Sequence, residues 1–169
     1  MSEPIFSTIH GSGLYGLAHE GSDYDVFMVT DSTGKKVSHR MELDHEFDTV
    51  VDTTEVGIDA FLRKAWSGSH QSVEALFSRR KVWVNQDYRA MIEGARVGGA
   101  EVFAKYERTI KKFCYGDFKR RRHAVRLRFN LEGLRNEGRF NPEMTGTEIA
   151  FANAAANALK GDALLEKLI

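Results

Sequence analysis

Cysteine and proline are scarce in this chain of 169 residues, which has one cysteine, Cys114, and two prolines. A single cysteine excludes an internal disulfide framework and a cluster of thiolate metal ligands. The scarcity of proline and the lack of low-complexity tracts argue against disorder. Hydrophobic residues make up 42% of the chain and charged residues 28%, as in ordinary globular proteins. We therefore expect a folded chain with one main core.

Long hydrophobic runs are also missing. No apolar run approaches the roughly 18 to 20 residues that a membrane-spanning helix needs. The first ten residues, MSEPIFSTIH, do not combine a basic region, an apolar stretch and a cleavage site in the order of a secretory signal. We therefore expect a cytoplasmic protein with no membrane partner, and the sequence leaves its oligomeric state open.

The net charge is zero, but its distribution is uneven. Residues 1–60 carry twelve acidic and three basic side chains, whereas residues 101–139 carry twelve basic and five acidic ones. A site for a polyanion and divalent cations needs both signs, because acids hold the metal and bases hold phosphate. Two solvated faces of opposite charge would give the same asymmetry.

The hydrophobic pattern predicts strands in the first half of the chain and helices in the second. Strands are expected at 5–10, 24–30, 36–43, 45–54 and 82–84. Short helices are expected at 14–20, after a cap at Thr53 or Thr54, and after a cap at Ser69. From about Asp87 onward the pattern is helical.

These elements indicate an α+β fold. A small mixed-sheet core is expected at residues 1–86, followed by a helical C-terminal region at residues 87–169. The boundary is soft, because no linker rich in proline, glycine or serine separates the regions, and the two can form one compact unit.

Two aspartates, Asp23 and Asp25, stand before the apolar run VFMV. Alternate residues of a strand share a face, so their carboxylates are expected about 6 to 7 Å apart along it. Unpaired carboxylates beside an apolar strand are costly, and a hard cation offsets that cost. Mg²⁺ suits such a pair because it is commonly shared between carboxylates and substrate phosphates. The alternative is an exposed acidic turn.

A neighbouring strand offers a third carboxylate from the segment FDTVVD, where Asp48 and Asp52 are expected on one face. Asp52 is favoured because it stands at the expected strand end, directly before a helix, where ligands gather in open sheets. Its expected role is general base toward an attacking hydroxyl and ligand to a second metal. Asp48 stays open as the alternative third acid.

The segment Gly11-Ser12-Gly13 is a candidate phosphate-binding turn. Glycines let the backbone approach a ligand closely, and amide groups at a helix start attract anions. The Ser12 hydroxyl adds a donor. A turn of this composition alone is common, so its meaning depends on the acids that follow.

The second half offers a polar helix stripe formed by Lys119, His123, Arg126 and Asn130. His123 and Arg126 are candidates for contact with a triphosphate or an acceptor, and an exposed basic helix is the alternative. The basic run 119–122 is a candidate nucleic-acid contact, although it lacks interleaved aromatic residues for base stacking.

Glu74, on the predicted helix after Ser69, is expected to be structural and to pair with Arg79 or Arg80. Lining the pocket is the alternative for its carboxylate.

The spacing of Gly11-Ser12, ten residues, then Asp23-Tyr24-Asp25 and VFMV resembles the signature of the DNA polymerase beta-like nucleotidyltransferase superfamily. Residues 50–78 and 123–142 are further similar to segments of bacterial and phage predicted nucleotidyltransferases. The turn Ser69-His70-Gln71 departs from the Asn-Pro or similar residues found there, which puts the role of this turn in doubt.

The resemblance implies metal-dependent transfer of a nucleoside monophosphate from an NTP such as ATP to an acceptor hydroxyl, with release of pyrophosphate. It implies that Gly11 and Ser12, with Ser22, hold the nucleotide, and that Asp23, Asp25 and Asp52 hold two Mg²⁺ or Mn²⁺ ions. The acceptor could be tRNA, another RNA, DNA, a protein side chain or a small molecule.

Two other functions fit parts of the sequence. One is a non-catalytic member that binds nucleotide or a protein partner, as in a toxin-antitoxin pair, and the other is a nucleic-acid-binding module that uses the basic helix. The full set of acids favours catalysis over the first. Their clustering beside Gly-Ser favours catalysis over the second.

Overall fold

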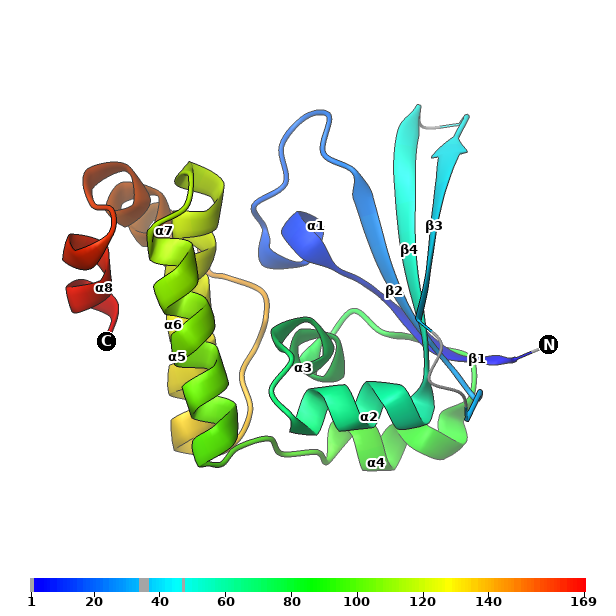
Figure 1. Cartoon of the computed structure of the whole chain (residues 1–169). Helices are drawn as coiled ribbons and strands as arrows, with labels where there is room; N and C mark the ends of the chain where they lie inside the picture. The colour runs from blue at the N-terminus through cyan, green and yellow to red at the C-terminus, as the bar shows by residue number, and fades with distance from the viewer. Residues whose placement is uncertain (1, 34–36, 47) are drawn as a thin grey trace.

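The structure is a computed structural model that describes residues 2–33, 37–46 and 48–169. It contains a five-stranded sheet followed by a largely helical second half (Figure 1). The strands are β1 (Pro4–Ile9), β2 (Tyr24–Thr30), β3 (Val37–Asp44), β4 (Thr49–Gly57) and β5 (Val82–Trp83). The helices are α1 (Gly11–Tyr15), α2 (Ile58–Trp66), α3 (His70–Phe77), the 3₁₀ turn η1 (Gln86–Tyr88), α4 (Arg89–Glu93), α5 (Ala100–Cys114), α6 (Phe118–Glu137), α7 (Gly146–Ala158) and α8 (Asp162–Leu168).

The sheet is mixed, with the strand order β3-β4-β2-β1-β5. The central strands β2 and β4 are parallel, and the other neighbouring pairs are antiparallel. The crossover from β2 to β4 passes through β3, which pairs with the outer side of β4. The two central strands therefore start at the same end of the sheet.

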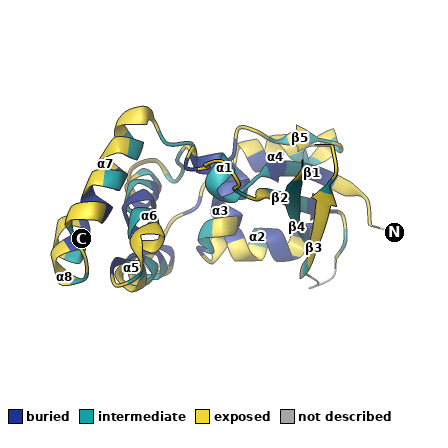
Figure 2. Cartoon of the chain, turned by 90° about the horizontal axis from the view of Figure 1, so that it is seen from above, coloured by how far each residue is buried: buried dark blue, intermediate teal, exposed yellow. Residues whose placement is uncertain are grey.

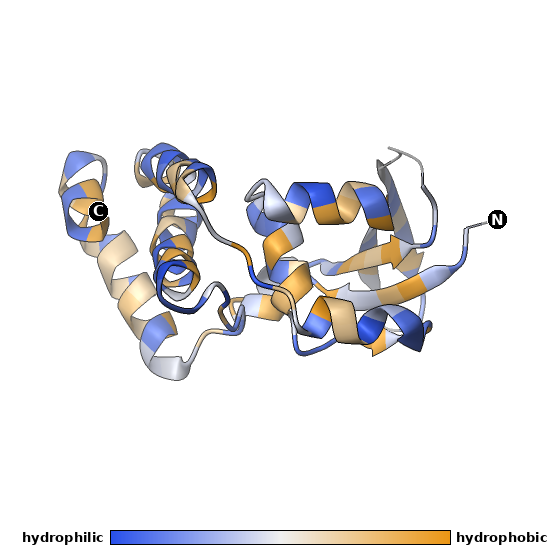
Figure 3. Ribbon diagram, turned by 90° about the horizontal axis from the view of Figure 1, so that it is seen from below, coloured by the Kyte–Doolittle hydropathy of each residue, from blue (hydrophilic) through white to orange (hydrophobic). Residues whose placement is uncertain are grey.

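Helices form two groups beside the sheet. Helices α2, α3 and α4 lie close to the strands, and α5 to α8 form a stack at the opposite end of the molecule from the N-terminus (Figures 1 and 2). Hydrophobic and hydrophilic residues alternate around the helices (Figure 3), as in α2, where Phe61 and Ala65 are buried and Arg63 is exposed. Helix α2 thus presents an apolar stripe to the core.

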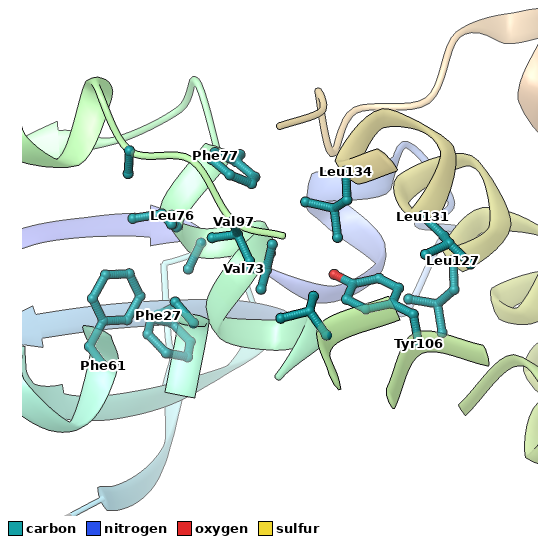
Figure 4. Packing of buried hydrophobic residues seen from close by; sticks show 14 of the residues in the cluster. Phe27, Phe61, Val73, Leu76, Phe77, Val97, Tyr106, Leu127, Leu131 and Leu134 are labelled. Atoms are coloured by element: carbon teal, nitrogen blue, oxygen red, sulfur yellow. The ribbon is translucent and has the colours of Figure 1, made fainter. Parts of the chain in front are cut away.

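One hydrophobic cluster joins the sheet region to the helical stack. In Figure 4, Phe27 and Phe61 lie on the sheet side, while Tyr106 and Leu127 lie on the stack side, with Val73 of α3 between the two groups. The predicted boundary near residue 86 stays a prediction.

The predicted α+β class, with a mixed sheet before a helical half, is confirmed. The predicted helix cap at Thr53 or Thr54 is wrong, because β4 continues to Gly57 and pairs Thr53 and Thr54 with Val26 and Phe27 of β2. Tertiary strand pairing here overrides a local capping signal. The first short helix also begins earlier than predicted, at Gly11.

None of the helices within the described residues is both long and apolar enough to cross a membrane.

Candidate active site

The two central strands place Asp25 and Asp52 side by side. In the parallel pair of β2 and β4, Asp25 is opposite Asp52, and Val29 is opposite Val56. Directly opposed residues point to the same face, and alternate residues along a strand share it. The two carboxylates therefore lie on the same face of the sheet as the buried side chains of Phe27, Val29 and Val56.

Helix α1 holds the turn predicted to bind phosphate against Asp25. The backbone N–H of His10 donates to the carbonyl of Asp25 over 2.8 Å, and Gly11 follows with a φ of 59°. A Cβ at Gly11 would lie 2.0 Å from Oδ2 of Asp25. Only glycine therefore allows the backbone to pass so close to this carboxylate in that conformation.

Gly-Ser-Gly is a poor helix-forming sequence, so packing must hold α1 in place. Its residues Leu14 and Tyr15 are buried together with Leu17, and Met144 and Ile149 from the region after α6 pack against them. Gly16 ends the helix in the left-handed conformation, at φ 76°. The turn is thus anchored to the helical stack by its apolar side chains.

A cavity of about 360 Å³ opens in front of the two carboxylates. It is bounded by the sheet, by α1 and α3, and by the corner between α5 and α6. Its lining residues are His10, Gly11, Ser12, Tyr15, Asp25, Val26, His39, Asp52, Thr54, His70, Gln71, Phe113, Lys119, His123 and Arg126.

The carboxylates of Asp25 and Asp52 have no basic partner among the residues that the structure describes. Neither forms an ion pair, and Oδ1 of Asp52 is buried without a hydrogen-bond partner. Burial raises the pKa of Asp25, and the negative charges of Asp52 and Asp23 raise it further, against a smaller opposing effect of Lys119. The arrangement holds excess negative charge that a cation would relieve.

A third carboxylate, on Glu74 of α3, lies fully buried behind the cavity. It accepts hydrogen bonds from Arg126, from the Tyr15 hydroxyl and, over 3.3 Å, from Nδ2 of Asn130. The Arg126 guanidinium also stacks 3.7 Å from the centre of the Tyr15 ring. Burial alone would raise the pKa of Glu74, but Arg126, His70 and His10 together hold that pKa below its usual range.

Three histidines surround this ion pair. His10, His70 and His123 all line the cavity. Burial lowers the pKa of each ring, and the positive charge of Arg126 lowers it further. The pKa of His123 falls to about 4, so this ring is neutral near pH 7.

The hydrogen-bonding role of His123 follows from its neighbour. Nε of Arg126 donates to Nδ1 of His123 over 3.3 Å. A neutral ring that accepts at Nδ1 carries its proton on Nε2. His123 is therefore a hydrogen-bond donor at Nε2, while Arg126 is occupied by Glu74 and His123.

Asp25 and Asp52 suit a Mg²⁺ or Mn²⁺ ion that is shared between the protein and substrate phosphates. They do not suit a metal held by protein ligands alone. Within the described residues, no three His, Cys, Asp or Glu side chains converge closely enough to hold a metal ion. Mg²⁺ commonly takes one or two carboxylates and completes its shell with water and substrate phosphates. The buried, unpartnered oxygen of Asp52 beside Asp25 matches that mode of binding.

The structure brings six of the predicted site residues to the cavity: Gly11, Ser12, Asp25, Asp52, His123 and Arg126. Asp23 lies just before β2, is exposed and does not line the cavity, although its charge acts on Asp25. The Ser22 hydroxyl accepts from the backbone of His19 over 3.0 Å and is also outside the lining. The functional roles of all these residues stay predictions.

Three placements expected from the sequence are wrong. Asp52 does not stand at the end of its strand before a helix, because β4 continues five residues beyond it to Gly57. Asp48 is not in a strand with Asp52, because β4 starts at Thr49 and Asp48 forms the preceding turn, exposed and with a φ of 47°. Glu74 pairs with Arg126, 52 residues later in the chain, and not with Arg79 or Arg80.

Sequence reasoning missed much of the cavity wall, including His10, Tyr15 and His70. A signal existed for His10, which directly precedes Gly-Ser and continues the alternation of β1, where Phe6 and Thr8 are buried. No local signal marked His70, whose place depends on the packing of α3.

Comparisons with known proteins give a likeness among solved structures. A scan against protein-family models found no match, and a search of the curated proteins found none. A search of solved structures found, among its matches, a nucleotidyltransferase-like protein from Exiguobacterium sibiricum 255-15, with a TM-score of 0.43 and 10% sequence identity. The match covers 99% of this chain and 64% of that chain, so this chain spans less than two thirds of its length. Likeness at this level assigns no chemistry to the cavity, which has to be argued from its own geometry.

Proposed function

We propose that this chain is a nucleotidyltransferase that transfers a nucleoside monophosphate from an NTP to an acceptor hydroxyl, with release of pyrophosphate. The observation that carries the proposal is the pairing of Asp25 with Asp52 in front of Gly11 and Ser12. One cavity, large enough for a nucleotide, holds both features. They are two acids without a basic partner in the described structure and a glycine turn whose backbone passes close to one of these acids.

Asp25 and Asp52 are the residues that would hold Mg²⁺ or Mn²⁺, with Asp23 nearby at the start of β2. The bound cation supplies charge neutralisation at the phosphates and lowers the pKa of the attacking hydroxyl. Gly11 and Ser12 offer backbone and hydroxyl donors to the phosphates. Nε2 of His123 offers a further, neutral donor from the opposite wall.

In the proposed reaction, the acceptor oxygen forms a bond to the α-phosphorus of the NTP. The bond from that phosphorus to the oxygen bridging to the β-phosphorus breaks, and pyrophosphate leaves with the bonding electron pair. The hydroxyl proton passes to the carboxylate of Asp52, which lines the cavity.

The corner between α5 and α6 favours a single-stranded nucleic acid as the acceptor. Within the basic run, Arg121 and Arg122 bond to Ala156 and Asn153 of α7 and so help to hold that helix. Lys119 and Arg120 make no such side-chain bond in the described structure, and both are exposed.

Two exposed aromatic rings precede these two cations in the chain, although none stands within the basic run itself. Tyr115 is 56% exposed and Phe118 is 37% exposed, both at the same corner. Exposed rings beside positive charge suit stacked bases and a phosphate backbone. Lys119 joins this surface to the cavity, so a strand lying on it could present its terminal hydroxyl to the site.

Label transfer from α-³²P-labelled NTPs tests the proposal. The protein is incubated with Mg²⁺ or Mn²⁺ and with single-stranded RNA, single-stranded DNA or tRNA. We expect label on one nucleic acid with wild type, and at least a hundredfold lower rate with Asp25→Asn or Asp52→Asn. Asp59→Asn, an exposed aspartate on α2, is the matched control and should keep wild-type activity.

Equal label transfer by wild type and Asp52→Asn would contradict the proposed site. Phe118→Ala tests the acceptor surface, because it should weaken transfer to the nucleic acid while leaving NTP binding unchanged. If wild type bound a nucleic-acid strand but neither wild type nor any variant transferred label to it, the result would instead favour a nucleic-acid-binding module.

A further inference from the structure

A second cavity, also of about 360 Å³, lies at the other end of α3. His70 at the start of α3 lines the candidate active site, and Leu76 and Phe77 at its end line the second cavity. Seven residues of helix separate the two ends by about 10 Å. The second cavity is lined by Leu76, Phe77, Ser78, Arg79, Lys81, Trp83, Ile92, Glu93 and Arg139.

The charges around this cavity are mostly positive. Three basic side chains line it, Arg79, Lys81 and Arg139, against the single carboxylate of Glu93. That carboxylate is already paired, because its Oε1 lies 2.8 Å from Nε of Arg89. The side chains of Arg79 and Arg139 make no hydrogen bond or ion pair with any other described residue.

Lys81 uses two of its N–H donors within the protein and has one left for a ligand. Its Nζ donates to the carbonyls of Leu76 and Ser78, over 2.8 and 2.6 Å, and lies 5.6 Å from the centre of the Phe6 ring. An ammonium group has three N–H donors, so one remains for a further acceptor.

The ammonium group of Lys81 is largely removed from water. Burial lowers the pKa of Lys81 to about 8, whereas the negative charge of Glu93 raises it and the positive charge of Arg139 lowers it to a smaller extent. A bound anion would reverse this effect by favouring the ammonium form.

Capping of α3 explains only part of this arrangement. Lys81 satisfies carbonyls at the C-terminal end of the helix, which is a common structural use of lysine. That role does not require two further arginines at the same cavity. The guanidinium groups of Arg79 and Arg139 and the ammonium group of Lys81 instead form a set of hydrogen-bond donors that suits phosphate oxygens.

We propose that this second cavity binds a phosphate group, carried either by pyrophosphate or by a small organic phosphate monoester. A phosphate monoester, which carries about two negative charges near pH 7, balances the excess positive charge of the lining. Trp83 and Phe77 give the cavity an apolar wall, which an organic substituent on the phosphate would contact. This inference does not rest on the proposed function, because it uses none of the residues of the candidate active site.

The fluorescence of Trp83 provides a local test. The chain has two tryptophans, so Trp66→Phe leaves Trp83 as the single reporter. This protein is titrated, without divalent metal and at constant ionic strength, with pyrophosphate, phenyl phosphate and sulfate. We expect a saturable change with one of the two phosphates and at least tenfold weaker binding when Arg139→Gln is added.

Two controls separate this site from general charge and from the first cavity. Arg108→Gln removes an exposed arginine elsewhere, on α5, and should leave the affinity unchanged. Asp25→Asn should also leave it unchanged, so a failure of the proposed transfer reaction would be distinguishable from a failure here. Thermal unfolding of Arg139→Gln should match that of its parent, since this side chain has no described partner.

The two phosphates identify the ligand class. Tighter binding of pyrophosphate supports the inorganic ligand, and tighter binding of phenyl phosphate supports an organic monoester that contacts Trp83. The inference would be overturned if neither phosphate gave a saturable change. It would also be overturned if sulfate bound equally well or if Arg139→Gln and Arg108→Gln had the same affinity.

Discussion

Carboxylates at the candidate active site fall into two groups that differ in how the protein neutralises them. Glu74 lies behind the cavity and receives Arg126, Tyr15 and Asn130. Asp25 and Asp52 lie in the cavity wall, face each other across two strands and have no basic partner in the described structure. The region around one cavity thus contains a compensated and an uncompensated set of charges.

This difference separates the scaffold from the site that awaits a ligand. A buried ion pair with all its hydrogen bonds fixes the positions of the elements that carry it, here α1, α3 and α6. Two like charges on adjacent strands lower stability, and such a cost commonly marks a functional site. The predictions below test the two sides of this comparison in order of expected effect on the free energy of unfolding.

Removing the charge of Glu74 should have the largest effect. Glu74→Gln leaves the buried Arg126 without its counter-charge, and we expect a loss of about 3–5 kcal/mol in the free energy of unfolding. Glu107→Gln is the matched control, because it breaks the exposed pair with Arg135 and should cost at most about 1 kcal/mol. Urea denaturation measures both, and similar losses in the two variants would contradict the structural role of Glu74.

Adding a methyl group at Gly11 should have the next largest effect on the free energy of unfolding. Gly11→Ala combines a φ of 59° with a Cβ that would meet Asp25 at 2.0 Å. Gly21→Ala is the matched control, since Gly21 has a φ of 81° but no atom lies within 4 Å of the position that its Cβ would take. We expect about 1 kcal/mol for Gly21→Ala and about 2–4 kcal/mol for Gly11→Ala.

Denaturation curves of the two glycine variants give the test. If both variants lost the same free energy of unfolding, a Cβ at Gly11 would cause no clash with Asp25. The described close packing of Gly11 against this carboxylate would then be wrong.

Acid should weaken the fold through the histidines of the cavity. Burial lowers the pKa of His123 to about 4, so between about pH 6.5 and 4 the unfolded chain binds a proton that the folded chain does not. Stability from this residue is therefore full above pH 6.5 and is lost as the pH falls, by about 2 kcal/mol at pH 5. His10 and His70 act in the same direction.

The measurement is the free energy of unfolding of wild type and His123→Asn from pH 7.5 to pH 5. The variant should lose less stability over this range than wild type. His45→Asn, which removes an exposed histidine after β3, should follow wild type. An identical pH dependence of wild type and His123→Asn would show that His123 titrates normally.

The sequence predicted the parts of the site that depend on local patterns. Strand alternation and the resemblance singled out Gly11, Ser12, Asp25 and Asp52, which the structure brings to one cavity. Gly11, Ser12 and Asp25 follow from one turn and from strand alternation along one short segment, whereas Asp52 lies inside β4 and not at the strand end where it was expected. Local sequence is sufficient for such features.

Features that depend on long-range packing escaped prediction. The helical stripe contained Arg126, but no pattern could show that its partner is Glu74, 52 residues earlier. Alternation predicts Asp48 in the strand with Asp52, because the alternating pattern does not reveal where a turn ends. Asp48 instead lies in a turn, since aspartate tolerates the positive φ found there. His10 and His70 meet only because the strand order and α3 bring them to the same wall.

The most direct test of the account is the thermal unfolding of wild type and Asp52→Asn, first with a chelator and then with Mn²⁺ and an NTP analogue that has a non-hydrolysable α,β linkage. Without metal, the variant should be more stable by a few tenths to about 1 kcal/mol, because the repulsion with Asp25 is relieved. With metal and nucleotide near 100 times the dissociation constant, wild type should gain about 2.7 kcal/mol and become the more stable protein. Equal gains in both proteins, or a variant that is less stable with chelator, would contradict the account.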